Sequence, residues 1–305
     1  MRVTNWLIVG LLTLLMAACG TTEKQKGEKL TIITTTGMIE DAVKNITGEL
    51  ADVEGLMGPG VDPHLYKATP SDLQKLRGAD IVFYNGLHLE GSMTDVLEKF
   101  ARKKAVFPLS DGLDEKKLRT PEDGSTVHDP HIWFDVELWS QAVSYAAEKI
   151  AAQDPDNATV YKTNAEKYLQ QLHELNNWTR TQIQSIPSQS RVLITAHDAF
   201  GYFGSAYDIE VKGLQGISTV AEFGLKDISG LVNFIVSHKI KAVFVETSVP
   251  HKSLEAVVSG CHEKQHNISI GGTLYSDAMG ALGSEAGTYI GMVKSNVNTI
   301  VSALK

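Results

Sequence analysis

The sequence predicts an α/β protein with two lobes, each holding a parallel β-sheet flanked by helices, joined by a single long rigid helix. Three observations predict this architecture. Strand patterns alternate with helix patterns in both halves of the chain, which is typical of parallel sheets with crossover helices. Similar buried strands, 79–83 (ADIVF) and 241–245 (KAVFV), occupy equivalent places in the two halves. Between the halves, residues 157–186 carry one long helical repeat of apolar positions.

Composition excludes several classes of protein. The chain has 305 residues, 43% hydrophobic and 21% charged, an ordinary globular composition. Acidic residues outnumber basic ones by 36 to 28 without a long run of either sign, so we expect no nucleic-acid partner. Two cysteines are too few for a disulfide framework, which leaves metal or catalytic chemistry to other side chains.

The first residues have the layout of an export signal. Arg2 precedes an apolar run over 6–16, which is shorter than the ~20 residues needed to cross a bilayer. Small residues directly before Cys19 resemble a bacterial lipobox, in which the cysteine is lipidated. We therefore predict a lipoprotein signal peptide over 1–18 and a polar tether over 19–29. The protein would be exported and anchored to the membrane, facing the periplasm or the cell exterior.

The first lobe is expected over 30–155. The β-branched run 30–36 ends at Gly37 and predicts a strand, and 80–84 (DIVFY) predicts a buried one. Residues 112–130 are polar and predict a loop. The remaining elements follow from the same patterns: strands over 51–57 and 104–109, and helices over 38–48, 71–78, 89–102 and 135–152.

The linking helix is expected within 156–187. Asp154-Pro155 is a helix-start signal and Pro187 ends the pattern. Thirty helical residues at ~1.5 Å each would span ~45 Å, the length of a whole domain. The apolar positions are spaced alternately by four and three residues and predict a packing face; they are Tyr161, Ala165, Tyr168, Leu172 and Leu175.

The second lobe is expected over 188–305, where the strand and helix alternation starts again. Its predicted strands cover 191–195, 209–214, 241–246 and 267–270, and its predicted helices cover 199–207, 227–238, 254–266 and 284–304.

Four side chains with metal-ligand chemistry follow strand ends. Ligands of open α/β sheets bind at the carboxyl ends of strands. In the first lobe, His64 and His131 each follow an Asp-Pro pair; in the second, His197 follows a strand directly and Asp277 ends the segment GGTLYSD. Imidazole suits zinc or iron, and a carboxylate adds the hard oxygen that manganese favours. We expect one metal site in the cleft between the lobes.

Several segments resemble a known family. GVDPHLYKATPSDLQKLRGADIVFYNGLHLE, DPHIWFD, TAHDAFGYF, GISTVAEFG and GGTLYSDAMG match, in order, the blocks of solute-binding lipoproteins of bacterial ABC transporters for manganese or zinc, the metal-binding cluster that includes the lipoprotein adhesins. The resemblance implies that His64, His131, His197 and Asp277 ligate one divalent ion. That ion would be Zn²⁺ or Mn²⁺, with Fe²⁺ as a third candidate. The resemblance also implies a monomer that docks on a membrane ABC permease with its ATPase.

Two departures bear on the metal. Zinc-specific members often carry a His-rich loop before the second ligand, where 112–130 holds only His128. Many manganese-specific members have Glu where this chain has His197, so three His and one Asp resemble a dual manganese/zinc subgroup. Asp198 and Glu246 are candidates for orienting imidazoles; their alternative roles are a capping Asp and a strand-end Glu.

Two other functions are open at this point. His262-Glu263-Lys-Gln-His266 is the zinc-protease motif H-E-x-x-H, with Glu263 as the base. The motif stands at the end of a predicted helix and lacks a third ligand, so it is more typical of a solvated last turn. A surface adhesin with a structural metal is the other alternative, although no repeat or stalk supports it. We expect a binding protein and not an enzyme.

Overall fold

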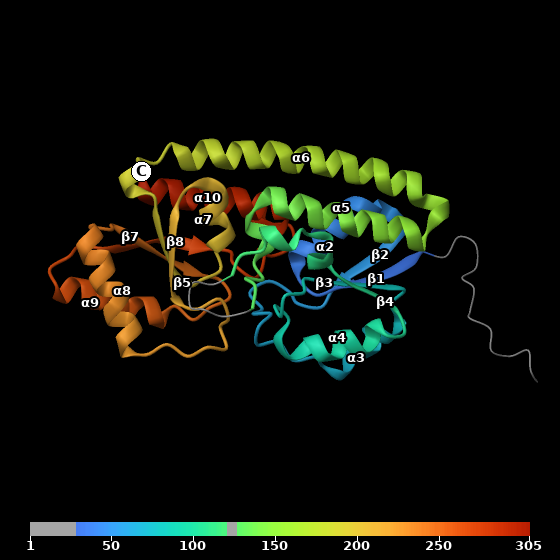
Figure 1. Cartoon of the computed structure of the whole chain (residues 1–305), viewed down its shortest axis with the longest axis horizontal. Helices are drawn as coiled ribbons and strands as arrows, with labels where there is room; N and C mark the ends of the chain where they lie inside the picture. The colour runs from blue at the N-terminus through green and yellow to red at the C-terminus, as the bar shows by residue number, and fades with distance from the viewer. Residues whose placement is uncertain (1–28, 121–126) are drawn as a thin grey trace, which may run out of the picture.

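The computed structural model describes residues 29–120 and 127–305, which form an elongated molecule with two four-stranded parallel sheets (Figure 1). The predicted α/β fold class is confirmed, and both sheets have the same topology. The first sheet has the order β2-β1-β3-β4, and the second has the order β6-β5-β7-β8. The strands are β1 (Leu30–Thr34), β2 (Ala51–Gly55), β3 (Ile81–Tyr84), β4 (Ala105–Pro108), β5 (Val192–His197), β6 (Glu210–Gln215), β7 (Ala242–Glu246) and β8 (Ser269–Leu274).

Helices cover both faces of each sheet. In Figure 1, α3 and α4 lie below the first sheet, α8 and α9 lie beside the second, and α6 runs above both. The predicted signal peptide and Cys19 lie outside the described residues; within the described part, no helix is long and apolar enough to cross a membrane. The helices are α2 (Gly37–Thr47), α3 (Pro70–Gly78), α4 (Thr94–Ala101), α5 (Val136–Gln153), α6 (Ala158–Gln184), α7 (Gly201–Tyr207), α8 (Leu225–His238), α9 (Lys252–Glu263) and α10 (Tyr289–Leu304).

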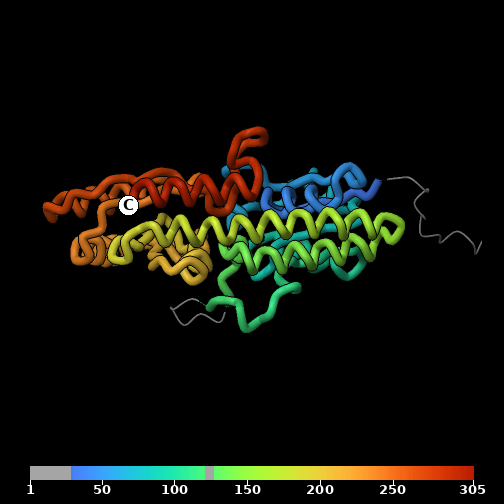
Figure 2. Tube along the Cα trace, turned by 90° about the horizontal axis from the view of Figure 1, so that it is seen from above, coloured from blue at the N-terminus to red at the C-terminus, as the bar shows by residue number. Residues whose placement is uncertain are grey.

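The long helix α6 links the two lobes. Its 27 residues span about 40 Å, and seen from above it extends along most of the molecule (Figure 2). The apolar stripe predicted from the sequence is buried along its whole length. Two tyrosines of the stripe also make hydrogen bonds: Tyr161 donates to Asp154 (2.6 Å), and Tyr168 donates to Asp41 of α2 (2.9 Å). The stripe is therefore a packing face, as predicted.

The two sheets share one hydrophobic cluster on the side of α6. Alternate residues of a strand face opposite sides of its sheet. Ile32 of β1 and Phe244 of β7 accordingly lie in the same cluster, together with Leu172 of α6 and Val297 of α10. The opposite faces of the sheets have separate clusters under α3 and α4 and under α8 and α9. A core common to both lobes disfavours a large hinge motion between them.

The last strand is longer than predicted. The sequence predicts its end at residue 270, because Gly271 and Gly272 are poor strand residues, yet β8 continues to Leu274. A Cβ at Gly271 would lie 2.8 Å from the Cβ of Ala303, so glycine there permits α10 to pack closely on the strand. Gly272 has a φ of +149° beside the register shift between Val243 and Phe244. This pair of glycines is thus part of the sheet.

Helix α4 is shorter than predicted. The sequence predicts a helix from residue 89, whereas α4 begins at Thr94 after a short 3₁₀ turn, Gly91–Met93. Gly91, inside the predicted range, has a φ of +43°, which a right-handed α-helix excludes. The α-helix therefore begins only after this residue.

Candidate metal centre

Four side chains from both lobes converge in the cleft. His64 lies in the loop after β2, His131 in the loop before α5, His197 is the last residue of β5, and Asp277 follows β8. One ligand atom from each lies within 4.8 Å of all the others. All four residues are at most 4% exposed. The structure therefore brings together all four residues that the sequence offered as ligands.

The distances between the ligand atoms suit a small cation. A tetrahedral zinc ion with bonds of about 2.0–2.1 Å would hold its ligand atoms about 3.4 Å apart. The Nε2 atoms of His64 and His131 are 3.4 Å apart. Asp277 lies 3.4 Å from His131 Nε2 through Oδ1 and 3.2 Å from His197 Nε2 through Oδ2. His64 Nε2 lies 3.9 Å from Asp277 Oδ2.

The carboxylate of Asp277 lacks the partners that burial demands. Neither of its oxygens accepts a hydrogen bond of good geometry within residues 29–120 and 127–305. An ionised carboxylate held in a protein interior without donors is costly. A divalent cation among the four side chains would satisfy both oxygens, so the donor set fits a metal ion of the zinc or manganese type.

Two carboxylates outside this set lie against the Nδ1 atoms of two of the imidazoles. Asp129 Oδ1 lies 2.7 Å from His131 Nδ1 and also accepts the His131 backbone N–H (3.0 Å). Glu246 lies 2.5 Å from His197 Nδ1 through Oε2, and its Oε1 accepts the His197 backbone N–H (2.9 Å). A carboxylate bound to Nδ1 orients a metal-ligating imidazole and raises the basicity of Nε2. The orienting role of Glu246 stays a prediction. Sequence reasoning proposed Glu246 but missed Asp129, although the Asp-Pro-His motif was a signal for it.

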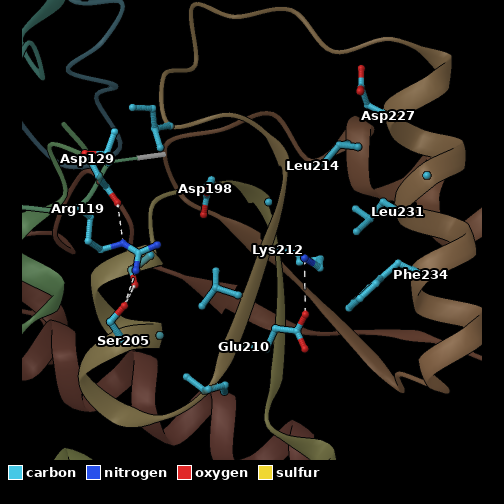
Figure 3. Close-up of a pocket in the computed structure, with 18 of the residues that line it drawn as sticks. Arg119, Asp129, Asp198, Ser205, Glu210, Lys212, Leu214, Asp227, Leu231 and Phe234 are labelled. Atoms are coloured by element: carbon cyan, nitrogen blue, oxygen red, sulfur yellow. Dashed lines mark hydrogen bonds and ion pairs between the residues drawn. The ribbon is translucent and has the colours of Figure 1, made fainter. Parts of the chain in front are cut away.

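Asp198 occupies a different place from Glu246. It lines a pocket of about 830 Å³ beside the metal centre, together with Arg119 and Asp129. Figure 3 shows Arg119 between Asp129 and Ser205: its Nε is 3.7 Å from Asp129 Oδ2, and its guanidinium also donates to Ser205. Asp198 thus faces this pocket, and its role in orienting an imidazole stays a prediction.

The Asp-Pro-His motif at 62–64 makes different contacts from the one at 129–131. Asp62 Oδ1 accepts the backbone N–H of His64 (2.8 Å), and its Oδ2 accepts the hydroxyl of Thr219 (2.6 Å). Thr219 lies in the loop between β6 and α8 of the second lobe. Asp62 therefore ties the His64 loop to the opposite lobe.

Burial and neighbouring charges shift the pKa values of the four ligand residues in different directions. Burial and the neighbouring imidazoles lower the pKa of His64 to about 4, despite the nearby Asp277. Burial alone would lower the pKa of His131, but Asp129 and Asp277 raise it to about 9. Glu246 and Asp277 likewise outweigh burial and raise the pKa of His197 well above its usual value. These imidazoles in turn outweigh burial at Asp277 and hold its pKa well below its usual range.

The histidines of the H-E-x-x-H motif do not form a comparable centre. His262 Nε2 lies 3.1 Å from the carbonyl oxygen of Ile268, and His266 Nε2 lies 2.6 Å from that of Ile240. Helix α9 ends at Glu263, so His266 is not on the helix at all. The two rings bind backbone carbonyls around the helix end, as the solvated-turn interpretation expected.

The profile of a known protein family matches residues 32–303; its description is "Zinc-uptake complex component A periplasmic", ZnuA. The chain belongs to the ZnuA family. This confirms the resemblance found in the sequence motifs.

Individual members of the ZnuA family agree with this assignment. The manganese-binding lipoprotein MntA of Bacillus subtilis is 48% identical over 295 residues, which cover 96% of each chain. The manganese ABC transporter substrate-binding lipoprotein PsaA of Streptococcus pneumoniae is 30% identical, over 98% of this chain and 97% of its own. The solved structure of the periplasmic zinc-binding protein TroA from Treponema pallidum has a TM-score of 0.89 and 45% identity, covering 91% of this chain and 99% of TroA.

Proposed function

We propose that this protein is an extracytoplasmic solute-binding protein that captures one divalent transition metal and delivers it to an ABC permease with its ATPase. The ion is zinc or manganese, and the ligands are His64, His131, His197 and Asp277. The observation that carries the proposal is the cluster itself: four buried ligand atoms lie within 4.8 Å of one another, and one belongs to a carboxylate that accepts no hydrogen bond within the described residues. The metal-binding and transporter names of the relatives support the same function.

The four side chains should bind zinc at least as tightly as manganese in solution. Three nitrogens and one carboxylate can complete a zinc tetrahedron, or a five-coordinate site if both Asp277 oxygens bind. Manganese binds such donors more weakly by the Irving–Williams order. We therefore infer that one site takes either ion, with zinc the tighter in a direct competition.

Metal analysis combined with substitutions tests the proposal. Elemental analysis of protein purified without added metal should find zinc, manganese or both, and calorimetry should give one site. Replacing His64, His131, His197 or Asp277 by Ala should abolish tight binding. The matched control is the His262→Ala/His266→Ala double variant, which should bind as the parent does. Loss of metal from the control with retention in the four ligand variants would overturn the proposal.

We also propose that the mature protein is a monomer anchored through a lipid on Cys19. The apolar run followed by Ala17-Ala18-Cys19 supports the anchor. Cys19→Ser should release the protein from the membrane fraction of cells while leaving metal affinity unchanged. Unaltered membrane association would contradict the lipid anchor and leave the metal site untouched.

A further inference from the structure

One indole ring connects the metal-ligand segments of the two lobes. Trp133 stands two residues after His131, and its Nε1 donates to the carbonyl oxygen of Ser276 at 3.1 Å. Ser276 immediately precedes Asp277. A single hydrogen bond therefore joins the segment that carries a ligand of the first lobe to the segment that carries a ligand of the second.

Trp133 is held in place by contacts from both lobes. Its ring lies edge-on to the His131 ring, with centroids 5.3 Å apart and an interplanar angle of 69°. Its backbone carbonyl accepts the hydroxyl of Tyr289 at 2.7 Å. The residue is 1% exposed, so packing fixes the indole as well. The fixed ring thus couples the position of the His131 segment to that of the Ser276 carbonyl, which its Nε1 binds.

The Asp277 segment is also held by contacts at Tyr275 and at the side chain of Ser276. Asn296 of α10 accepts the backbone N–H of Tyr275 at 2.9 Å and donates to its carbonyl at 2.7 Å. The hydroxyl of Ser276 lies 2.8 Å from that of Ser248. These bonds tie the segment to the second lobe, whereas the Trp133 bond ties it to the first.

We propose that Trp133 is a positioning residue that sets the separation of His131 and Asp277, and with it the coordination geometry of the metal. The proposal rests on the metal-binding function proposed above. His131 Nε2 and Asp277 Oδ1 are 3.4 Å apart, the spacing of neighbouring ligands on a tetrahedral ion. A small shift of either segment changes that spacing, and a metal site tolerates only fractions of an ångström.

The chain provides a matched pair of substitutions. Trp133→Phe retains a buried ring beside His131 and removes the N–H donor. Trp139→Phe makes the same chemical change at a fully buried tryptophan of α5, whose Nε1 has no hydrogen-bond partner within the described residues. Trp139 packs on Tyr289, with ring centroids 5.5 Å apart, and is not among the metal ligands. The two variants therefore differ in whether a bond to the Asp277 segment is lost.

Two measurements on the full chain separate positioning from general packing. Zinc affinity is measured by competition with a chromophoric chelator, and the visible absorption of bound Co²⁺ reports its coordination number. Trp133→Phe should weaken zinc binding about 10- to 100-fold, as loss of a residue that orients ligands does, and should change the Co²⁺ spectrum. Trp139→Phe should leave both unchanged.

Equal behaviour of the two variants, or an unchanged Co²⁺ spectrum in Trp133→Phe, would overturn the positioning role. His131→Ala distinguishes that failure from failure of the proposed function: undiminished zinc binding by His131→Ala would reject the metal site itself. If Trp133→Phe does not fold, benzothienylalanine is installed at both positions, because it replaces the indole N–H by sulfur with little change in ring size. The same contrast between the two positions is then expected.

Discussion

Asp129 Oδ1 lies 2.7 Å from His131 Nδ1, so the carboxylate holds the ring of the histidine that follows it by two residues. In the other Asp-Pro-His motif, Asp62 accepts the backbone N–H of His64 and turns its second oxygen to Thr219. The two Asp-Pro-His tripeptides thus have different structural roles. One carboxylate raises the basicity of an imidazole, and the other secures a loop.

This difference predicts unequal effects of one substitution. Asp129→Asn keeps an acceptor near His131 but removes the charge that favours a basic imidazole, so zinc affinity should fall about tenfold or more. In Asp62→Asn, the side-chain amide can still form hydrogen bonds with His64 and Thr219. The zinc affinity of this variant should therefore change much less. Chelator competition measures both. Equal losses would show that charge on Asp129 does not act through His131.

Metal binding should release protons at neutral pH. Because the pKa of His131 is raised to about 9 and that of His197 is also raised, we expect both to carry a proton at pH 7 without metal, whereas His64, with its pKa lowered to about 4, should be neutral. A metal needs neutral imidazoles, so affinity should fall as the pH drops from about 9 toward 6. Calorimetry in buffers of different ionisation enthalpy should find about two protons released per ion at pH 7. Binding without proton release would contradict these ionisation states.

The same shift has a consequence for the metal-free fold. The folded-state pKa of His131, about 9, exceeds the ordinary value of 6.5. Its contribution to stability is therefore full below pH 6.5 and is lost as the pH rises through 9. The difference in melting temperature between the parent and His131→Ala, measured without metal, should shrink over that interval. A difference that grows with pH would contradict the assignment.

Gly91 should be intolerant of a side chain. A Cβ there would clash with the carbonyl oxygen of His64, and the φ of +43° at this position is itself unfavourable to other residues. Gly91→Ala should shift the His64 loop, destabilise the fold by at least about 1 kcal/mol from the dihedral alone, and weaken zinc binding. Gly58→Ala is the control, because a Cβ there meets none of the surrounding atoms of residues 29–120 and 127–305 within 4 Å. Thermal melts and zinc titrations check both variants.

Metal removal should lower stability without reshaping the molecule. Free zinc at a hundredfold excess over its Kd should stabilise the protein by about 2.7 kcal/mol, and a chelator should reverse the gain. The core shared by the two lobes around α6 resists hinge closure, so X-ray scattering should give the same radius of gyration with and without zinc. A marked compaction on loading would show that the lobes move.

The sequence predicted the fold well because its signals are local. Period-two and helical patterns, with Pro155 and Pro187 beside α6, marked nearly every element. The errors arose where distant packing overrides local preference. Gly271 and Gly272 looked like the end of a strand, yet α10 packs on them and β8 continues.

For the site, the ligands could be expected from their places at strand ends and from the family motifs. The residues that contact these ligands were harder to predict. Asp129 contacts an imidazole ring and Asp62 does not, yet both stand in the same Asp-Pro-His tripeptide. The bond from Trp133 to Ser276 joins residues 143 positions apart, and no spacing in the sequence indicates it.

The cluster that contains Ile32 and Phe244 has a consequence for how the molecule comes apart. The cluster on the side of α6 combines residues from both lobes, so neither half retains this whole cluster when the other is lost. We therefore expect unfolding to be all-or-none across the chain. A bound metal ion should therefore slow proteolysis in both lobes equally, from β1 to α10. Without metal, proteases should degrade the whole protein and leave no stable half.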